Sequence, residues 1–150
     1  SVATNYGGGL AGNIGGPAVI KNCYVNMDIE GTTDLCAAVA GRVRATLNME
    51  NVYVAGSCNK CGVIGGGQNA ETGAGTYKNI VVWNNLDQNF GPTAEGDVLE
   101  GISYYDGANF AELQQTVVGW GYPWFCGMEE GEYPTFNFEK TEYEPNKAAL

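Results

Sequence analysis

The sequence contains no histidine and only seven lysines and arginines, against 17 acidic residues. An acidic chain without a basic patch repels phosphate backbones, so nucleic acid is not expected as a partner. No run approaches the roughly 18 apolar residues of a membrane-spanning helix, so no membrane span is expected. The first ten residues, SVATNYGGGL, have neither a basic start nor an apolar segment, so no export signal is expected in this stretch.

The absence of histidine also bears on the motif CNKC at 58–61. A zinc site would need a second CxxC pair or two histidines, and neither is present. A thioredoxin-like redox site would need the motif to open a helix, whereas here it runs into GVIGGG. We therefore expect neither zinc nor redox chemistry at this motif, and no cofactor.

The acidic excess lies entirely in the last part of the chain. Up to residue 85 five acids balance five bases, whereas the other twelve acids face only Lys140 and Lys147. A chain of 150 residues suits one domain. We predict a single domain in two parts, 1–86 and 87–150, with the change near residues 84–89.

A motif recurs three times in the first part, as VIKNCYV, NMENVYV and TYKNIVV. Its asparagines, Asn22, Asn51 and Asn79, are 29 and 28 residues apart. A fixed period with insertions in loops is the signature of stacked units, and short runs rich in β-formers indicate strands. We predict an all-β fold, a parallel β-helix (solenoid) of about three coils at residues 6–34, 35–60 and 61–86.

In such a stack, corresponding residues lie about 4.8 Å apart and form columns of like side chains. Two inward apolar columns are expected, Cys23, Val52 and Ile80, and Val25, Val54 and Val82; a third apolar column comprises Leu10, Val39 and Ile64. A column facing water is expected to alternate in charge through Lys21, Glu50 and Lys78, and Tyr24 should lie over Tyr53. The asparagines are expected at a bend, with amides hydrogen-bonded along the axis. A corner needing positive φ or close backbone approach is expected at Gly12, Gly41 and Gly66.

The five cysteines are Cys23, Cys36, Cys58, Cys61 and Cys126. The repeat places Cys36 over Gly7 and Cys61 over Cys36, at a Cα separation that permits a disulfide. A reduced thiol ladder and a bridge between Cys36 and Cys61 both stay open. Cys58 is expected in a loop, and Cys126 is unassigned.

The second part, 87–150, is expected to be a small acidic and aromatic cap on the last coil. EGISYY is expected to be one further strand, and GANFAELQQTVVGW a helix, with Asn109 as N-cap and Glu112 three residues later. An apolar stripe on this helix comprises Phe110, Leu113, Val117 and Trp120.

The aromatic residues that follow have two interpretations. In the first they pack as core against the last coil; this set is Trp120, Trp124, Phe125, Tyr133 and Phe136. In the second, Trp120, Tyr122 and Trp124 form an exposed platform that stacks on sugar rings.

Several acidic residues are candidates for catalytic or metal-binding groups. Asp28, Glu30 and Asp34 cluster in MDIEGTTD and are weak candidates for a calcium site. A glycoside hydrolase needs two carboxylates held across a cleft, yet no column repeats an acid. A polysaccharide lyase would need a basic residue, for which Arg42 and Arg44 are the only repeat-borne arginines. We therefore expect no enzyme, with a lyase or hydrolase as the alternative.

These features resemble the GLUG-motif repeat family of bacterial, often Bacteroidota, surface proteins. The resemblance covers roughly residues 5–136 and rests on GGGLAGNIGG followed by IKNCYV, on weaker copies ending in MENVYV and YKNIVV, and on the tail DGANFAELQQTVVGWGYPWFCGMEEGEYPTF. The second copy departs from it with CAAVAG, and the third has a longer spacer.

The resemblance implies a β-helical stack, a secreted or bacterial cell-surface location, and a role in adhesion or as an accessory repeat. It brings no catalytic residues. The expected function is a noncatalytic module that binds a glycan or a host or cell-surface protein; a carbohydrate-binding module is an alternative.

Overall fold

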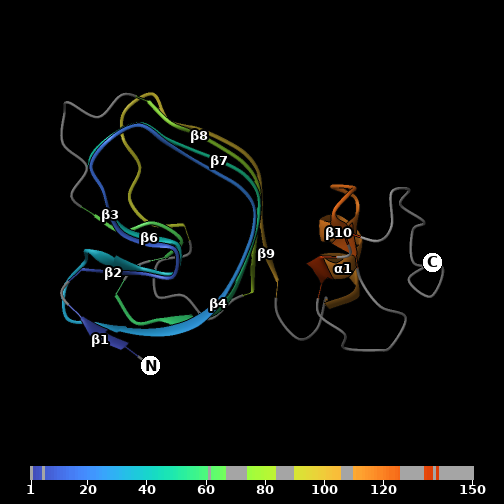
Figure 1. The fold of residues 1–150 in the computed structure, drawn as a ribbon, viewed down its shortest axis with the longest axis horizontal. Coiled ribbons are helices and arrows are strands. Elements are labelled where there is room, and N and C mark those ends of the chain that lie inside the picture. The colour runs from blue at the N-terminus through green and yellow to red at the C-terminus, as the bar shows by residue number, and fades with distance from the viewer. Residues whose placement is uncertain are drawn as a thin grey trace. The chain divides into compact units, whose positions relative to one another are not determined.

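The computed structural model describes residues 2–4, 6–60, 62–66, 74–83, 90–105, 110–125, 134–136 and 138. These residues are mostly β-strand, with parallel sheets and one short helix (Figure 1). The chain divides into two compact units, Ser1–Tyr104 and Tyr105–Leu150, which are described separately below. Among the described residues, no helix has both the length and the apolar character needed to cross a membrane.

The first unit contains a five-stranded sheet in the order β1-β4-β7-β8-β9. Its strands are β1 (Val2–Thr4), β4 (Ala18–Gly31), β7 (Leu47–Cys58), β8 (Thr76–Trp83) and β9 (Val98–Tyr105). The pairs β1–β4, β4–β7 and β7–β8 are parallel. Each repeat motif therefore lies beside the next one, and the further strand expected at EGISYY is confirmed as β9.

Two small parallel sheets join the segments that precede these long strands. They pair β2 (Gly7–Gly8) with β5 (Cys36–Ala37) and β3 (Ala11–Ile14) with β6 (Ala40–Val43). In Figure 1, β4, β7, β8 and β9 follow one another side by side, and β3 lies beside β6. The pairing between repeats therefore includes the glycine-rich segments that precede the motifs, as well as the motifs themselves.

The register confirms the columns built around the asparagines. Cys23 pairs with Val52 and Val52 with Ile80, while Val25 pairs with Val54 and Val54 with Val82. Val52, Val54, Ile80 and Val82 are completely buried. Because parallel partners project to the same side of a sheet, each column places equal or similar side chains next to one another in the core.

The predicted third column and the glycine corner are one residue out of register. Ala40 pairs with Ile64, so Val39 corresponds to Val63 rather than to Ile64, and Gly41 corresponds to Gly65 rather than to Gly66. None of Gly12, Gly41 and Gly66 has positive φ. The close approach is confirmed, because a Cβ on Gly41 would lie 2.3 Å from the carbonyl oxygen of Gly7.

The cysteines follow the expected register only in part. Cys36 pairs with Gly7, as predicted, and is completely buried. The loop position predicted for Cys58 is wrong: Cys58 ends β7, pairs with Ile29, and its thiol donates to the Cys36 carbonyl oxygen across 3.4 Å. Continued pairing with β4 extends β7 beyond the apolar motif. Cys61 and Cys126 lie outside the described residues, so the state of the Cys36–Cys61 pair stays a prediction.

The second unit contains the expected helix, α1 (Phe110–Val118), and a short antiparallel pair, β10 (Trp124–Phe125) with β11 (Thr135–Phe136). Leu113 and Val117 are buried, which confirms them as part of the apolar stripe. The hydroxyls of Tyr105 and Thr116 lie 2.8 Å apart and link the start of the unit to α1. Asn109 lies outside the described residues. The role of this unit as a cap stays a prediction.

Candidate functional site

The exposed platform predicted from Trp120, Tyr122 and Trp124 is not formed. Trp124 is only 1% exposed, and its ring contacts Phe136 at a centroid distance of 4.6 Å. Trp120 is half-buried and packs edge-on against Trp124 at 5.1 Å. The tryptophans belong to the packed interior of the second unit because each ring buries large apolar area against another ring. Tyr133 lies outside the described residues.

Tyr122 alone of the three is well exposed, and it has a different partner. Its ring packs edge-on against Phe138 with centroids 6.3 Å apart, and the two side chains are 53% and 66% exposed. Sequence reasoning missed Phe138. Its signal is the alternation in TFNF, which puts Phe136 and Phe138 on one side of an extended chain. We call these two residues the aromatic pair.

The three acidic residues considered for calcium are not gathered into one cluster. Asp28 and Glu30 lie on β4, and Asp34 lies in the turn before β5; all three are exposed. The Asp28 carboxylate instead accepts a hydrogen bond of 2.8 Å from Ser57 on the neighbouring strand. No group of three metal-ligating side chains occurs in the part of the chain that the structure describes.

The two repeat-borne arginines are also placed by the structure. Arg42 on β6 lies opposite Asn13 of β3, and its guanidinium carbon is 5.9 Å from the centre of the Tyr6 ring. Its buried Nε has no hydrogen-bond partner. Arg44, just after β6, is exposed. Arg42 is therefore held by contact with an aromatic face.

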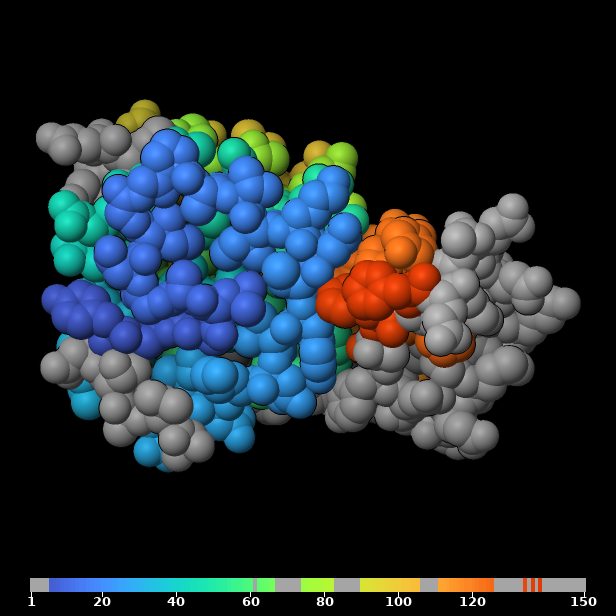
Figure 2. Space-filling model, in the orientation of Figure 1, coloured from blue at the N-terminus to red at the C-terminus, as the bar shows by residue number. Residues whose placement is uncertain are grey.

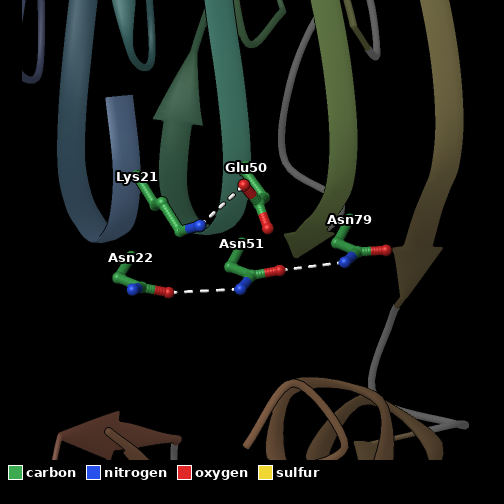
Figure 3. A network of polar contacts seen from close by, with 5 residues as sticks. All are labelled: Lys21, Asn22, Glu50, Asn51 and Asn79. Atoms are coloured by element: carbon green, nitrogen blue, oxygen red, sulfur yellow. Dashed lines mark hydrogen bonds and ion pairs between the residues drawn. The ribbon is translucent and has the colours of Figure 1, made fainter. Parts of the chain in front are cut away.

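A regular polar array runs across the main sheet at the bend in its strands (Figure 3). The bend occurs at Asn22, Asn51 and Asn79, whose φ values are 50°, 54° and 53°. Among residues other than glycine, asparagine is one of the few that adopt this left-handed conformation readily. Main-chain pairing skips these positions, so each strand turns here while its flanks stay in register.

The asparagine amides form a ladder across the strands. Asn51 donates to Asn22 Oδ1 across 3.2 Å, and Asn79 donates to Asn51 Oδ1 across 2.9 Å. Figure 3 shows the three side chains in one line. The predicted bend and amide ladder are both confirmed. The hydrogen bonds between neighbouring amides satisfy polar side-chain atoms that are part-buried at the bend.

Beside the ladder runs a column of alternating charge. Lys21 pairs with Glu50 at 2.8 Å, and Lys78 pairs with Glu100 at 3.6 Å. All four side chains are between 42% and 65% exposed, so the expectation that this column faces water is confirmed. We call Lys21, Glu50, Lys78 and Glu100 the charge column.

The charge column extends to β9, which sequence reasoning did not align with the repeat. Gly101 follows Glu100 just as an asparagine follows each earlier charged residue, and it has the same kind of φ, 66°. A Cβ on Gly101 would lie 3.0 Å from Asn79 Oδ1, which places it next to the ladder. The sequence feature that could have shown this alignment is EGI at 100–102, which corresponds to KNI at 78–80 with glycine in place of asparagine.

Cys23, which follows Asn22 on β4, is not an activated nucleophile. Burial raises the pKa of Cys23, whose thiol donates a hydrogen bond to the Lys21 carbonyl oxygen across 3.3 Å. A thiol with a raised pKa stays protonated at neutral pH and is a poor nucleophile. The array is therefore suited to holding strands together and presenting charge, rather than to covalent chemistry at this cysteine.

The chain was also compared with known proteins. No protein-family model matches it, and neither the curated proteins nor the solved structures include a significant match.

Proposed function

We propose that this chain is a noncatalytic module of a secreted or cell-surface protein, similar to the GLUG-motif repeat proteins, and that it serves adhesion or ligand binding. In this proposal the parallel strands are successive coils of a β-solenoid. The observation that carries the proposal is the residue-by-residue pairing of the three motif copies, with an asparagine at positive φ in each. Such stacking builds an extended surface from repeated small units.

The partner that we propose is a glycan or a protein of a host or cell surface. The acidic balance of the chain argues against polyanionic partners such as nucleic acid. The exposed charge column provides alternating cations and anions at strand spacing, a pattern that suits polar recognition.

Carbohydrate binding is a second candidate function, and the aromatic pair favours it. Tyr122 and Phe138 present two ring edges and faces to solvent on the second unit. Exposed aromatic groups of this kind mark binding surfaces more often than isolated exposed side chains do. In this proposal the sugar site is the aromatic pair rather than the predicted platform of Trp120, Tyr122 and Trp124, and only Tyr122 belongs to both.

The test measures binding and turnover on the same preparation. The protein is applied to a glycan array, and the glycans that bind are then incubated with it in a reducing-sugar assay. We expect binding without release of reducing ends. Turnover that is abolished by Asp28→Ala would contradict the noncatalytic proposal and favour a polysaccharide lyase or hydrolase.

The carbohydrate candidate is tested by Tyr122→Ala and Phe138→Ala. Each should weaken binding to an array-positive glycan by about tenfold or more, because an aromatic contact is lost from an exposed site where folding does not depend on it. Tyr6→Ala is the matched control, since Tyr6 is 52% exposed and lies in the first unit. Equal affinity of all three variants and the wild type would exclude the aromatic pair as the sugar site.

A further inference from the structure

The main sheet ends in two edges that differ in their pairing. At one end, β1 covers only Ile29, Glu30 and Gly31 of β4, and among the described residues no strand pairs with 18–28 on that side. At the other end lies β9, and no described strand follows it. Figure 2 shows the first of these ends, where blue atoms of the N-terminal segments form the face of the first unit turned to the viewer. Open strand edges are templates for pairing with another chain.

The two edge strands carry opposite charges at corresponding positions, just before the bend. Lys21 ends the charge column on β4, and Glu100 ends it on β9. Within the sheet every step of this column joins a lysine to a glutamate on the adjacent strand. If β9 of one copy lay next to β4 of another, Glu100 would meet Lys21 and the alternation would continue across the junction.

The same two edges carry apolar residues where the inner strands carry polar ones. Val19 pairs with Asn48, and Asn48 with Thr76. Val98 continues this column on β9, where its backbone N–H donates to the Gly75 carbonyl oxygen across 3.0 Å. Val19 and Val98, the two ends, are 72% and 53% exposed. In a junction between β4 and β9 these valines would face each other and lose their contact with water.

We propose that copies of this chain associate head to tail, with β9 of one copy pairing in parallel with residues 18–28 of β4 in the next. The contact repeats the register that already joins neighbouring strands in the sheet. It places Val98 against Val19 and Glu100 against Lys21. The asparagine ladder does not continue across it, because Gly101 has no side chain, so the junction depends on main-chain hydrogen bonds, the valines and the ion pair. A contact between two different surfaces leaves one of each free, so association proceeds by addition of further copies.

The test uses two variants that each block one edge. In Val19→Lys the β4 edge is blocked and β9 is intact, and in Val98→Lys the reverse holds. Edge lysines prevent strand pairing, so we expect each variant alone to associate about tenfold more weakly or not at all in sedimentation velocity, whereas the wild type forms dimers and larger species as its concentration rises. An equal mixture of the two variants should form a dimer that contains one copy of each and does not grow further.

Ala111→Lys, which adds the same charge on the exposed face of α1, should associate like the wild type. Circular dichroism verifies that all variants fold, as expected for changes at exposed positions. A wild type that stays monomeric up to its solubility limit overturns the proposal. Association of either variant alone as strong as that of the wild type also overturns it, because the contact would then lie elsewhere or between two like edges. A mixture that stays monomeric overturns it as well.

Discussion

The side-chain amide of Asn51 donates a hydrogen bond to Asn22 Oδ1 across 3.2 Å, and both residues have a positive φ, 54° for Asn51 and 50° for Asn22. One residue type therefore meets two separate requirements at this bend. It tolerates the left-handed backbone, and it carries both a donor and an acceptor that reach the next strand. Glycine meets the first requirement only, and alanine meets neither.

Substitutions at Asn51 separate these two contributions. Asn51 donates to Asn22 and accepts from Asn79, so Asn51→Gly removes both hydrogen bonds and should lower the free energy of unfolding by about 1–2 kcal/mol. Asn51→Ala removes the same hydrogen bonds and also strains the backbone, because alanine, unlike glycine, has a Cβ that disfavours positive φ. This variant should be about 0.5–1 kcal/mol less stable than Asn51→Gly. Urea denaturation measures both. Equal stability of the two variants would show that the backbone at this bend is not strained for alanine.

The charge column predicts a destabilisation that depends on salt. Glu50 lies between Lys21 and Lys78 on adjacent strands, so Glu50→Lys would align three cations. We expect a loss of about 1 kcal/mol in dilute buffer, with a smaller loss in 1 M salt because exposed charges are screened. Urea denaturation at the two salt concentrations measures this, with Glu95→Lys in an exposed turn as the control. A loss that is independent of salt would mean that packing, rather than charge, holds Glu50 in place.

The inner valine column predicts a large effect at Val54. Val54 is completely buried between Val25 and Val82, so Val54→Ala removes two methyl groups from a packed core and should cost about 2 kcal/mol. Val19→Ala makes the same chemical change at an exposed position and should alter stability by less than about 0.5 kcal/mol. Thermal and urea denaturation of both variants provide the comparison. Similar losses for the two would argue against an interior built from this column.

The sequence predicted the register well where the repeat contains a distinctive residue. An asparagine occupies the same position in each motif, and the predicted columns within three residues of it match the register, from Lys21 with Glu50 to Val25 with Val54. The glycine-rich lead at 62–66 was misaligned by one residue, because small and apolar residues follow one another there and fit the column equally well in either register. β9 was not aligned because Gly101 meets the need for positive φ without the asparagine that marked the other copies.

The candidate site was harder to predict than the fold. Nothing in WGYPWF distinguishes a buried ring from an exposed one, because the segment follows neither a helical nor a strand period. Burial of Trp124 depends on its contact with Phe136, twelve residues later, across the β10–β11 pair. The same long-range pairing brings Phe138 near Tyr122, so the aromatic pair could be recognised only once the two segments were seen together.

Stability should fall at alkaline pH, with Tyr77 as one identifiable cause. Tyr77 is 1% exposed and packs edge-on against Phe90 with ring centroids 5.0 Å apart. Burial raises the pKa of its phenol above the ordinary value of 10.0, and the negative charge of Asp97 raises it further. The folded protein therefore retains this proton where the unfolded chain loses it.

The sign follows from that difference. Below pH 10 both states bind the proton, and the contribution of Tyr77 to stability is fully present. As the pH rises above 10, only the unfolded state releases the proton, so the free energy of unfolding falls by up to about 1.4 kcal/mol per pH unit. Cys23, whose pKa is raised above 9.0 by burial, adds a loss of the same sign that begins about one unit lower.

Tyr77→Phe keeps the ring and removes the titrating hydroxyl. We expect its stability, measured by urea denaturation between pH 8 and pH 11, to decline less steeply above pH 10 than that of the wild type. Tyr122→Phe is the control, since it makes the same change at an exposed ring and should leave the steepness unchanged. If Tyr77→Phe declined as steeply as the wild type, the alkaline loss would have to arise from other groups, and the phenol of Tyr77 would be ionising equally in the folded and unfolded states.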